Sequence, residues 1–111
     1  MAALKAQIQA QALIRRAQAG GAMAMVLQKG DPDAGLIYLK VLRLDGRADL
    51  YAPTRDMSGA RAYRRPLGDP PPPESEADAF LDRERRMDPD FWIIEVEDRE
   101  GRSFLTDPVI D

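Results

Sequence analysis

The sequence predicts a single α+β domain, residues 1–111, in which a small antiparallel or mixed sheet of about five to six strands carries two helices packed on one face. Three observations lead to this fold class. The chain has 111 residues, near the usual size of one domain. Two stretches show the helical spacing of apolar residues, and several short runs rich in β-forming residues lie between turn signals. The expected order is β-α-β-β-β-(β)-α-β-β, without an internal repeat.

The first element combines two patterns. Its first half alternates apolar and polar side chains, as a strand does, but in residues that favour helices. In its second half the apolar positions take helical spacing, and Gly20-Gly21 ends the element. We predict a short strand near Leu4–Ile8 and a helix over Gln9–Ala19, with one helix over the whole stretch as the alternative. The segment is free of acids and contains arginine, as transit peptides do, but it lacks serine and continues into the next apolar run, so we assign it to the fold.

Three strands and a hairpin are expected in the middle of the chain. The turn KGDPDAG (Lys29–Gly35) separates the first two, since Pro32 pre-sets φ, aspartate bonds its own backbone and glycine supplies positive φ. Asp45-Gly46 is a strong hairpin signal. The predicted strands are Ala22–Gln28, Leu36–Leu44 and Arg47–Ala52.

The second half contains a loop, an edge strand, a stiff connector, a helix and a terminal hairpin. Ser75 and Asp78 suggest a capping box for the helix, and Asp88-Pro89 ends it. Its predicted buried stripe is Ala77, Phe80, Leu81 and Met87. The other predicted elements are a loop at Pro53–Gly59, a short edge strand at Arg61–Arg65, a proline-rich connector over residues 66–73, and strands at Phe91–Glu97 and Arg102–Thr106.

Histidine and cysteine are both absent from the sequence. This excludes disulfides, thiolate nucleophiles, Ser–His pairs, zinc ribbons and iron–sulfur centres. Any chemistry must use carboxylates, Lys, Arg, Tyr, Ser, Thr or a hard cation bound by oxygen atoms. We predict no cofactor.

Charge is unevenly distributed along the chain, although its net value is only −3. Residues 1–30 hold four basic residues and no acid, whereas residues 74–111 hold thirteen acids against five arginines. We expect the two ends to pair across one surface. The acidic balance argues against nucleic acid as a partner, and no apolar run approaches the roughly 20 residues of a membrane span.

Four strings in the sequence occur together in a recognisable order. They are ALIRRA (Ala12–Ala17), KGDPDAG (Lys29–Gly35), RLDGRADLY (Arg43–Tyr51) and DRERRMDPDFWIIEVED (Asp82–Asp98). Together they resemble the alphaproteobacterial family called domain of unknown function 1491, over nearly the whole chain apart from the loop Pro53–Pro73. The resemblance implies a small bacterial cytoplasmic protein and carries over no assigned activity. Where the family often has a bulky aromatic in the first strand, this chain has Ile8-Gln9-Ala10.

The strand at Phe91–Glu97 offers the first candidate site. Glu95 and Glu97 fall on one face of this strand, about 7 Å apart, and could hold Mg²⁺ or act as acid and base. The competing interpretation, which we favour, is that both glutamates pair with arginines. Trp92 lies on the other face, and we predict a core anchor whose indole N–H is hydrogen-bonded.

Asp31 and Asp33 form a second candidate in the KGDPDAG turn. A calcium loop of the EF-hand type needs a glutamate at its twelfth position, which here is Leu42, so that interpretation fails. A Pro-Asp…Glu-x-Lys nuclease pattern also fails, because no acid stands two residues before Lys40. Turn chemistry alone accounts for these residues.

Arginines on both sides of Tyr63 offer a basic candidate. Arg61, Arg64 and Arg65 could contact phosphate or an acidic protein, although an edge strand protected by charge is the commoner explanation.

Our leading functional hypothesis is a non-enzymatic accessory or protein-interaction module of the bacterial cytoplasm, with a protein as partner. The alternatives are a Mg²⁺-dependent hydrolase or nuclease that uses Glu95, Glu97 and one of Asp31 or Asp33, and weak nucleic-acid binding through Arg61, Arg64 and Arg65. No catalytic or metal-binding residue is assigned. The candidate interaction surface consists of Arg15, Arg16, Lys29, Asp31, Asp33, Asp90, Trp92, Glu95 and Glu97.

Overall fold

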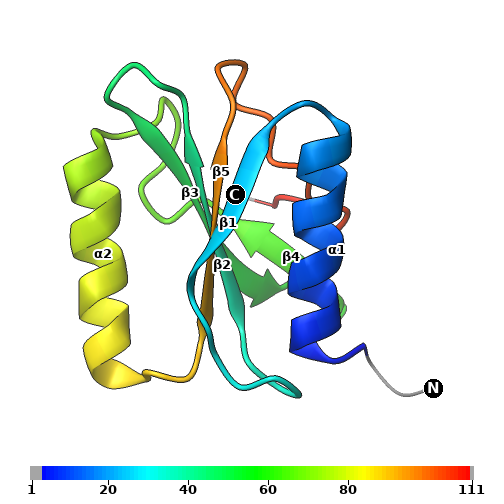
Figure 1. Ribbon diagram of the computed structural model, residues 1–111. Helices are drawn as coiled ribbons and strands as arrows, with labels where there is room; N and C mark the ends of the chain where they lie inside the picture. Colours follow the sequence, from blue (N-terminus) through cyan, green and yellow to red (C-terminus); the bar gives the residue numbers. More distant parts are fainter. Residues whose placement is uncertain (1–3, 111) are drawn as a thin grey trace.

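Five strands and two helices form the α+β fold of residues 4–110, the part of the chain that the computed structural model describes (Figure 1). The elements are α1 (Ala6–Ala19), β1 (Met23–Gln28), β2 (Ile37–Leu42), β3 (Ala48–Arg55), β4 (Arg61–Arg64), α2 (Glu74–Met87) and β5 (Trp92–Glu97). The strand order is β1-β5-β2-β3-β4. Only the β2–β5 pair is parallel, so the sheet is mixed, as the predicted fold class allows.

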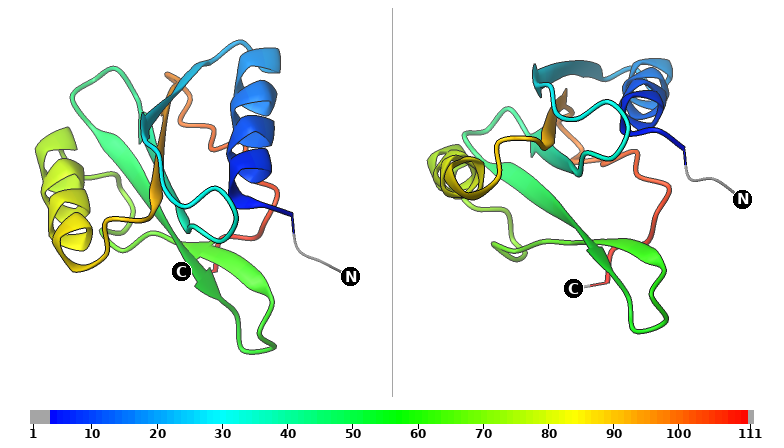
Figure 2. Two further views of the ribbon diagram at one scale, coloured as in Figure 1. Left: turned by 60° about the horizontal axis from the view of Figure 1, so that its bottom comes forward. Right: turned by 90° about the horizontal axis from the view of Figure 1, so that it is seen from below.

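The two helices cover opposite faces of the sheet, so the prediction that both pack on one face is wrong (Figures 1 and 2). Helix α1 packs with Leu39 and Ile94, whereas α2 packs with Tyr38 and Ile93. The reason lies in the central strands. Five consecutive residues of β2, Ile37–Val41, are buried, and a strand that is buried on both faces needs an element on each side.

Residues 6–19 form one helix, so the strand predicted near Leu4–Ile8 is wrong and the alternative of a single helix is confirmed. The buried residues of α1 are Ala6, Ala10, Leu13 and Ala17, which line one helical face. Helix-forming residues and this spacing outweigh the apparent alternation.

Helix α2 begins at Glu74, directly after Pro73, and no side chain caps its first turn, so the capping box at Ser75 is not formed. Asp78 instead bonds Lys40 of β2. Ala77 and Leu81 are buried as predicted and Phe80 is half-buried, but Met87, the last residue of the helix, is exposed. The helix ends before Asp88-Pro89, as predicted.

Strand β3 is longer than predicted and includes Pro53, which the sequence placed in a loop. Pro53 lies opposite Tyr63 of β4. The Tyr63 backbone N–H and carbonyl turn outward, to Pro108 and Ile110, so this is a pair without mutual hydrogen bonds. The N–H that proline lacks is therefore not needed at this position of the sheet.

The predicted strand Arg102–Thr106 is wrong, because residues 98–108 run irregularly beside the sheet. Phe104 has a φ of 60°, which no extended strand accommodates. Beyond it, the chain returns along β4, where the Tyr63 N–H donates to Pro108 over 2.8 Å and the Ile110 N–H donates to Tyr63 over 2.9 Å. The predicted end strand β4 is confirmed, and residues 108–110 cover its outer edge.

The proline-rich connector lies along the start of β3, where the Ala48 N–H donates to Pro72 and the Arg47 side chain donates to Pro71. Within residues 4–110, neither helix has the length and hydropathy needed to cross a membrane.

Candidate functional site

The KGDPDAG turn caps the N-terminus of α1. Lys5 provides no side-chain cap, and the first turn of the helix contains no acid. The amides of Ala6 and Gln7 donate instead to the carbonyl oxygens of Asp33 and Pro32, over 3.2 and 3.0 Å. Two of the N–H groups that a helix start leaves unpaired are thereby satisfied by a segment more than 20 residues away in the sequence.

Asp31 organises this turn. Its Oδ1 accepts the amides of Asp33 and Ala34 over 2.8 and 3.1 Å. Because these N–H groups favour the charged form, the pKa of the Asp31 carboxyl lies below its ordinary value. The Asp31 amide in turn donates to the carbonyl oxygen of Asp90 over 2.9 Å, which ties the turn to the start of β5.

Trp92 anchors the turn to the buried part of the sheet. It is 3 % exposed, and its indole N–H donates to the Asp31 carbonyl over 2.8 Å, so the predicted core anchor is confirmed. A Cβ at Gly30 would lie 2.4 Å from the Asp90 carbonyl oxygen, and one at Gly35 would lie 2.8 Å from that of Asp31. Close packing therefore accounts for the two glycines of this turn.

Glu95 and Glu97 share a face of β5, as predicted, but the prediction that both pair with arginines is wrong, because Glu95 pairs with a lysine. Its carboxylate lies 3.4 Å from the Lys40 ammonium, which also contacts Glu74 and Asp78 of α2 over 2.7 Å each. Lys40 is 3 % exposed. Burial lowers the pKa of Lys40, but the hydrogen bonds that the ammonium donates to Asp78 and Glu74 raise it by more, and the ammonium stays charged. The cluster fastens α2 to the sheet.

The hypothesised Mg²⁺ site of Glu95, Glu97 and Asp31 or Asp33 is wrong. Asp31 lies beside Asp90, before β5 begins, whereas Glu95 pairs with Met25 further along the strand and faces α2. No group of three or more acidic side chains within residues 4–110 is arranged to hold a metal ion. The turn and the glutamates belong to different ends and different faces of β5.

Of the remaining candidate residues, Lys29 is the first residue of the turn, whereas Arg15 and Arg16 lie apart from it. Arg16 donates its Nε to the Phe104 carbonyl over 2.9 Å, about 15 Å along the axis of α1 from its first residue. Arg15 and Lys29 are exposed. The structure thus gathers Asp31, Asp33, Asp90 and Trp92, and separates them from Arg15, Arg16, Glu95 and Glu97.

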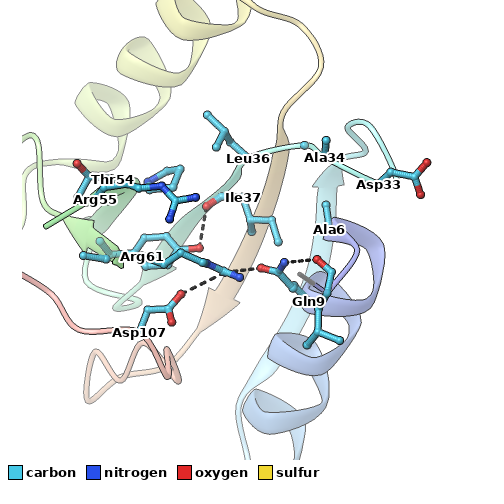
Figure 3. A pocket seen from close by; sticks show the side chains of 15 residues that line it. Ala6, Gln9, Asp33, Ala34, Leu36, Ile37, Thr54, Arg55, Arg61 and Asp107 are labelled. Carbon is cyan, nitrogen blue, oxygen red and sulfur yellow. Dashed lines mark hydrogen bonds and ion pairs between the residues drawn. The ribbon is translucent and has the colours of Figure 1, made fainter. Parts of the chain in front are cut away.

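A groove opens beside the turn, on the face of the sheet that α1 covers (Figure 3). It consists of two adjoining hollows of about 340 and 230 Å³. Its walls are the first turns of α1, the KGDPDAG turn, the end of β3, β4 and residues 105–107. We call it the α1–β4 groove. The residues that line both hollows are Leu4, Gln9, Ile37, Arg61, Tyr63 and Asp107.

Arg61 lines both hollows, and Figure 3 shows it between Gln9 and Asp107. Its guanidinium contacts the amide oxygen of Gln9 on one side and the Asp107 carboxylate, at 3.2 Å, on the other. Gln9 is held in place because its amide nitrogen donates to the Leu4 carbonyl over 2.6 Å. The Arg61 side chain is 44 % exposed, so a ligand can reach it.

The groove combines an apolar lining with an excess of guanidinium groups. Ile37 and Tyr63 are buried in it, and Leu4 and Leu36 are more than half exposed at its rim. Three arginines contribute to the two hollows, against the carboxylates of Asp33 and Asp107; the arginines are Arg16, Arg55 and Arg61. This lining therefore favours a ligand that carries an anionic group.

Tyr63 is not available for proton transfer at neutral pH. Its hydroxyl donates to the Ile37 carbonyl over 3.0 Å, and burial raises its pKa to about 12. Its role in the groove is to provide a fixed aromatic wall.

The three arginines of the nucleic-acid hypothesis lie in different places. Arg61 lies in the groove, Arg65 pairs with Asp69 at 3.6 Å, and Arg64 follows Tyr63 on the other face of β4. They do not form one basic patch.

Sequence reasoning singled out Arg61 but not Gln9, Arg55 or Asp107, which complete the groove. No local motif marks these residues, because they come from three distant parts of the chain. The sequence offers one signal for the groove, which is the surplus of arginine over acid around Tyr63. This signal does not say where in the fold these arginines lie.

The comparisons agree on the family. The model of the family described as "Protein of unknown function (DUF1491)" matches residues 4–106. None of the curated proteins matches the chain. A crystal structure of a DUF1491 family protein from Caulobacter crescentus CB15 is 42 % identical, with a TM-score of 0.90, and the match covers 97 % of this chain and all of that one.

Two solution structures are also similar. An NMR structure of a DUF1491 family protein from Caulobacter crescentus CB15 gives a TM-score of 0.87 at 42 % identity, over the whole of both chains. That of a protein from A. tumefaciens gives 0.79 at 36 % identity, over 94 % of this chain and 93 % of that one. The family match over nearly the full length confirms the resemblance read from the four strings. The chain belongs to the DUF1491 family of proteins of unknown function.

Proposed function

We propose that this protein is a non-enzymatic interaction module of the bacterial cytoplasm that binds an extended segment of a partner protein in the α1–β4 groove. The observation that carries the proposal is the groove itself, in which two adjoining hollows meet at Arg61. A segment in extended conformation places alternate side chains on one side, roughly 7 Å apart, and can fill successive hollows.

The lining specifies the chemistry of the segment. Ile37 and Tyr63 favour apolar side chains, and the exposed rim residue Leu36 would be buried by the bound chain. Arg61 and Arg55 each retain N–H groups beyond those bonded to Gln9, Asp107 and Gly59. We therefore expect an aspartate, a glutamate or a terminal carboxylate between apolar residues.

The titratable groups of the groove support binding over catalysis. Asp107 is paired with Arg61, Asp33 lies 3.5 Å from the Lys5 ammonium at the surface, and the Tyr63 hydroxyl is bonded to a backbone carbonyl. Among the groove residues that the structure describes, no nucleophile stands next to a base. A catalytic pair would need such an arrangement.

The test is to select peptides from a random library on the full-length protein and to titrate the best one into the isotope-labelled protein by NMR. We expect sequences with at least one acid among apolar residues, and shifts concentrated at Gln9, Arg61 and Tyr63. Arg61→Glu should weaken binding tenfold or more, which corresponds to about 1.4 kcal/mol. Arg86→Glu, an equal change of charge at an exposed position of α2, should leave affinity unchanged.

Two outcomes would refute the proposal. One is the absence of any peptide that binds below about 1 mM, the range of the weakest specific contacts. The other is binding that Arg61→Glu leaves intact although both variants retain the wild-type circular dichroism. Arg61-dependent binding of a single-stranded oligonucleotide without peptide binding would instead favour the nucleic-acid alternative.

A further inference from the structure

We propose that Asp107 is an internal competitor for the ligand of the α1–β4 groove: its carboxylate occupies Arg61 in the free protein, and the acid of a bound segment displaces it. This inference rests on the proposed function and concerns the regulation of the same site. It begins from Arg61 Nη2, which contacts both Asp107 Oδ2, at 3.2 Å, and the amide oxygen of Gln9 (Figure 3).

The segment that carries Asp107 has the chemistry expected of the ligand. Residues 105–110 read LTDPVI, in which a single acid stands between apolar residues. Leu105 packs against the apolar cluster that includes Ile37 and Tyr63, and it lines the second hollow together with Asp107. The chain thus already places one apolar side chain and one carboxylate on the lining that a partner segment would use.

Other contacts hold both members of the ion pair in place. The last part of the segment is fixed to β4 by backbone bonds, since the Tyr63 N–H donates to Pro108 and the Ile110 N–H donates to Tyr63. Arg61 belongs to β4 itself and also contacts Gln9. The ion pair can therefore open without releasing the segment or the strand.

A ligand carboxylate that binds Arg61 by two bonds has to displace one of its present partners. Two parallel bonds to a guanidinium use Nη2 together with either Nη1 or Nε. Nη2 already contacts Gln9 and Asp107. Gln9 is neutral and is held by its own bond to the Leu4 carbonyl, whereas Asp107 carries the same charge as the incoming acid. Asp107 is therefore the partner that leaves.

The ion pair is exposed enough for this exchange. The side chains of Arg61 and Asp107 are 44 and 30 % exposed. Pairs with this exposure contribute little stability, because water competes for both groups. The exchange replaces one carboxylate at Arg61 by another, so the guanidinium stays paired. The binding of an acidic segment is nevertheless weakened by the contact that it first has to break.

Removal of the Asp107 carboxylate should strengthen the binding of an acidic peptide. The probes are the best peptide selected on the full-length protein and a copy in which its acid is replaced by the amide. Asp107→Asn should lower the dissociation constant of the acidic peptide about threefold and leave that of the amide peptide nearly unchanged. Calorimetric titration of the two peptides into wild type and variant measures this coupling.

Asp33→Asn is the matched control, since it removes an equal charge from the same groove. Asp33 lies 3.5 Å from Lys5 and makes no contact with Arg61. We expect it to change the affinity for the acidic peptide much less than Asp107→Asn does, with both variants retaining the wild-type circular dichroism. Equal gains in the two variants would show that only the net charge of the groove matters, and would overturn the inference.

The remaining outcomes separate this inference from the proposed function. Wild-type protein that binds the acidic peptide through Arg61, without a gain in Asp107→Asn, overturns the inference alone. A loss of affinity in Asp107→Asn also overturns it, because the carboxylate would then position Arg61 for the ligand. If neither protein binds any selected peptide, the proposed function fails, and the inference fails with it.

Discussion

Trp92 donates its indole N–H to the backbone carbonyl of Asp31, 61 residues earlier in the chain, over 2.8 Å. This contact joins the turn before β2 to the first residue of β5. The same turn supplies the carbonyl groups that receive the first amides of α1. One buried aromatic thus fixes a loop that in turn fixes the start of a helix and one wall of the groove.

The close packing around Trp92 predicts that Gly30 tolerates no side chain. A Cβ there would lie 2.4 Å from the Asp90 carbonyl oxygen and 2.8 Å from Trp92 Cδ1. We expect Gly30→Ala to cost about 3 kcal/mol, the upper range for overpacking. Gly46→Ala is the control: no atom lies within 4 Å, and only its positive φ of 88° opposes alanine, at about 1 kcal/mol. Urea unfolding measures both, and equal costs would contradict this account.

The capping of α1 predicts unusual protection at its N-terminus. The Ala6 and Gln7 amides are bonded to Asp33 and Pro32, so we expect them to exchange slowly with solvent deuterium. The Ser75 amide is the comparison. It also lies in a first helical turn, but within residues 4–110 it has no acceptor, and we expect rapid exchange. Comparable rates at the two helix starts would contradict the assignment of this cap.

The sequence predicted those elements whose signals are local. Strand β5, the turn at Pro32 and the end of α2 before Pro89 depend on a few adjacent residues, and all three are confirmed. The sequence did not predict that α2 covers the face of the sheet opposite to α1. The reason is that Lys40 makes β2 look half polar, although the strand is buried on both faces. Its ammonium reaches the acids of α2, and this long-range pairing hides the fully buried character of the strand.

The groove was beyond sequence reasoning for a different reason. It depends on the contacts of Arg61 with Gln9 and Asp107. These residues are far apart in the chain, and no periodic pattern of the sequence predicts that they meet. Asp107 reaches Arg61 only because the last residues leave the expected strand at Phe104 and return along β4. The identity of Arg61 as a candidate was available from the sequence, but its neighbours were not.

The contact between Asp98 and Arg102 predicts a loss of stability in acid. Arg102 donates its Nη2, Nε and backbone N–H to the carboxylate, over 2.7 to 3.0 Å. The side-chain bond from Arg102 first, and its backbone N–H second, hold the pKa of Asp98 below its ordinary value of 3.8, although burial opposes them. A carboxyl whose pKa is lower in the folded than in the unfolded protein adds stability at pH values above its unfolded pKa. This contribution disappears as the pH falls through its folded pKa.

Asp98→Asn should therefore flatten the dependence of unfolding free energy on pH below about 4. Asp90→Asn removes an exposed carboxylate that forms no ion pair within the described residues, and should leave the wild-type slope. Chemical unfolding in a series of buffers from neutral to acidic pH provides the measurement. A wild-type slope in Asp98→Asn would show that the Arg102 contact is not formed in solution.

Arg43 and Asp49 form an ion pair in which only the carboxylate is fully buried, and their energetics should be asymmetric. The Asp49 side chain is fully buried, and its Oδ2 accepts from Arg43 Nε over 2.7 Å, while its Oδ1 has no partner within residues 4–110. Arg43 is 30 % exposed and lies over Gly101, where a Cβ would come within 2.5 Å of the guanidinium. Water can solvate the arginine, but it cannot solvate the carboxylate.

Arg43→Gln should therefore cost about 3–5 kcal/mol, because it leaves a buried carboxylate without its counter-charge. Asp49→Asn removes that charge and leaves an arginine that water reaches, so we expect about 1–3 kcal/mol, the cost of an unpaired polar group. The double variant should be more stable than Arg43→Gln alone, since it no longer buries a charge. Urea unfolding at neutral pH, with Arg99→Gln as an exposed control, measures the cycle. If the double variant is less stable than Arg43→Gln, Asp49 is hydrated in the folded protein. The packing of Arg43 against Gly101 would then not exclude water from the carboxylate.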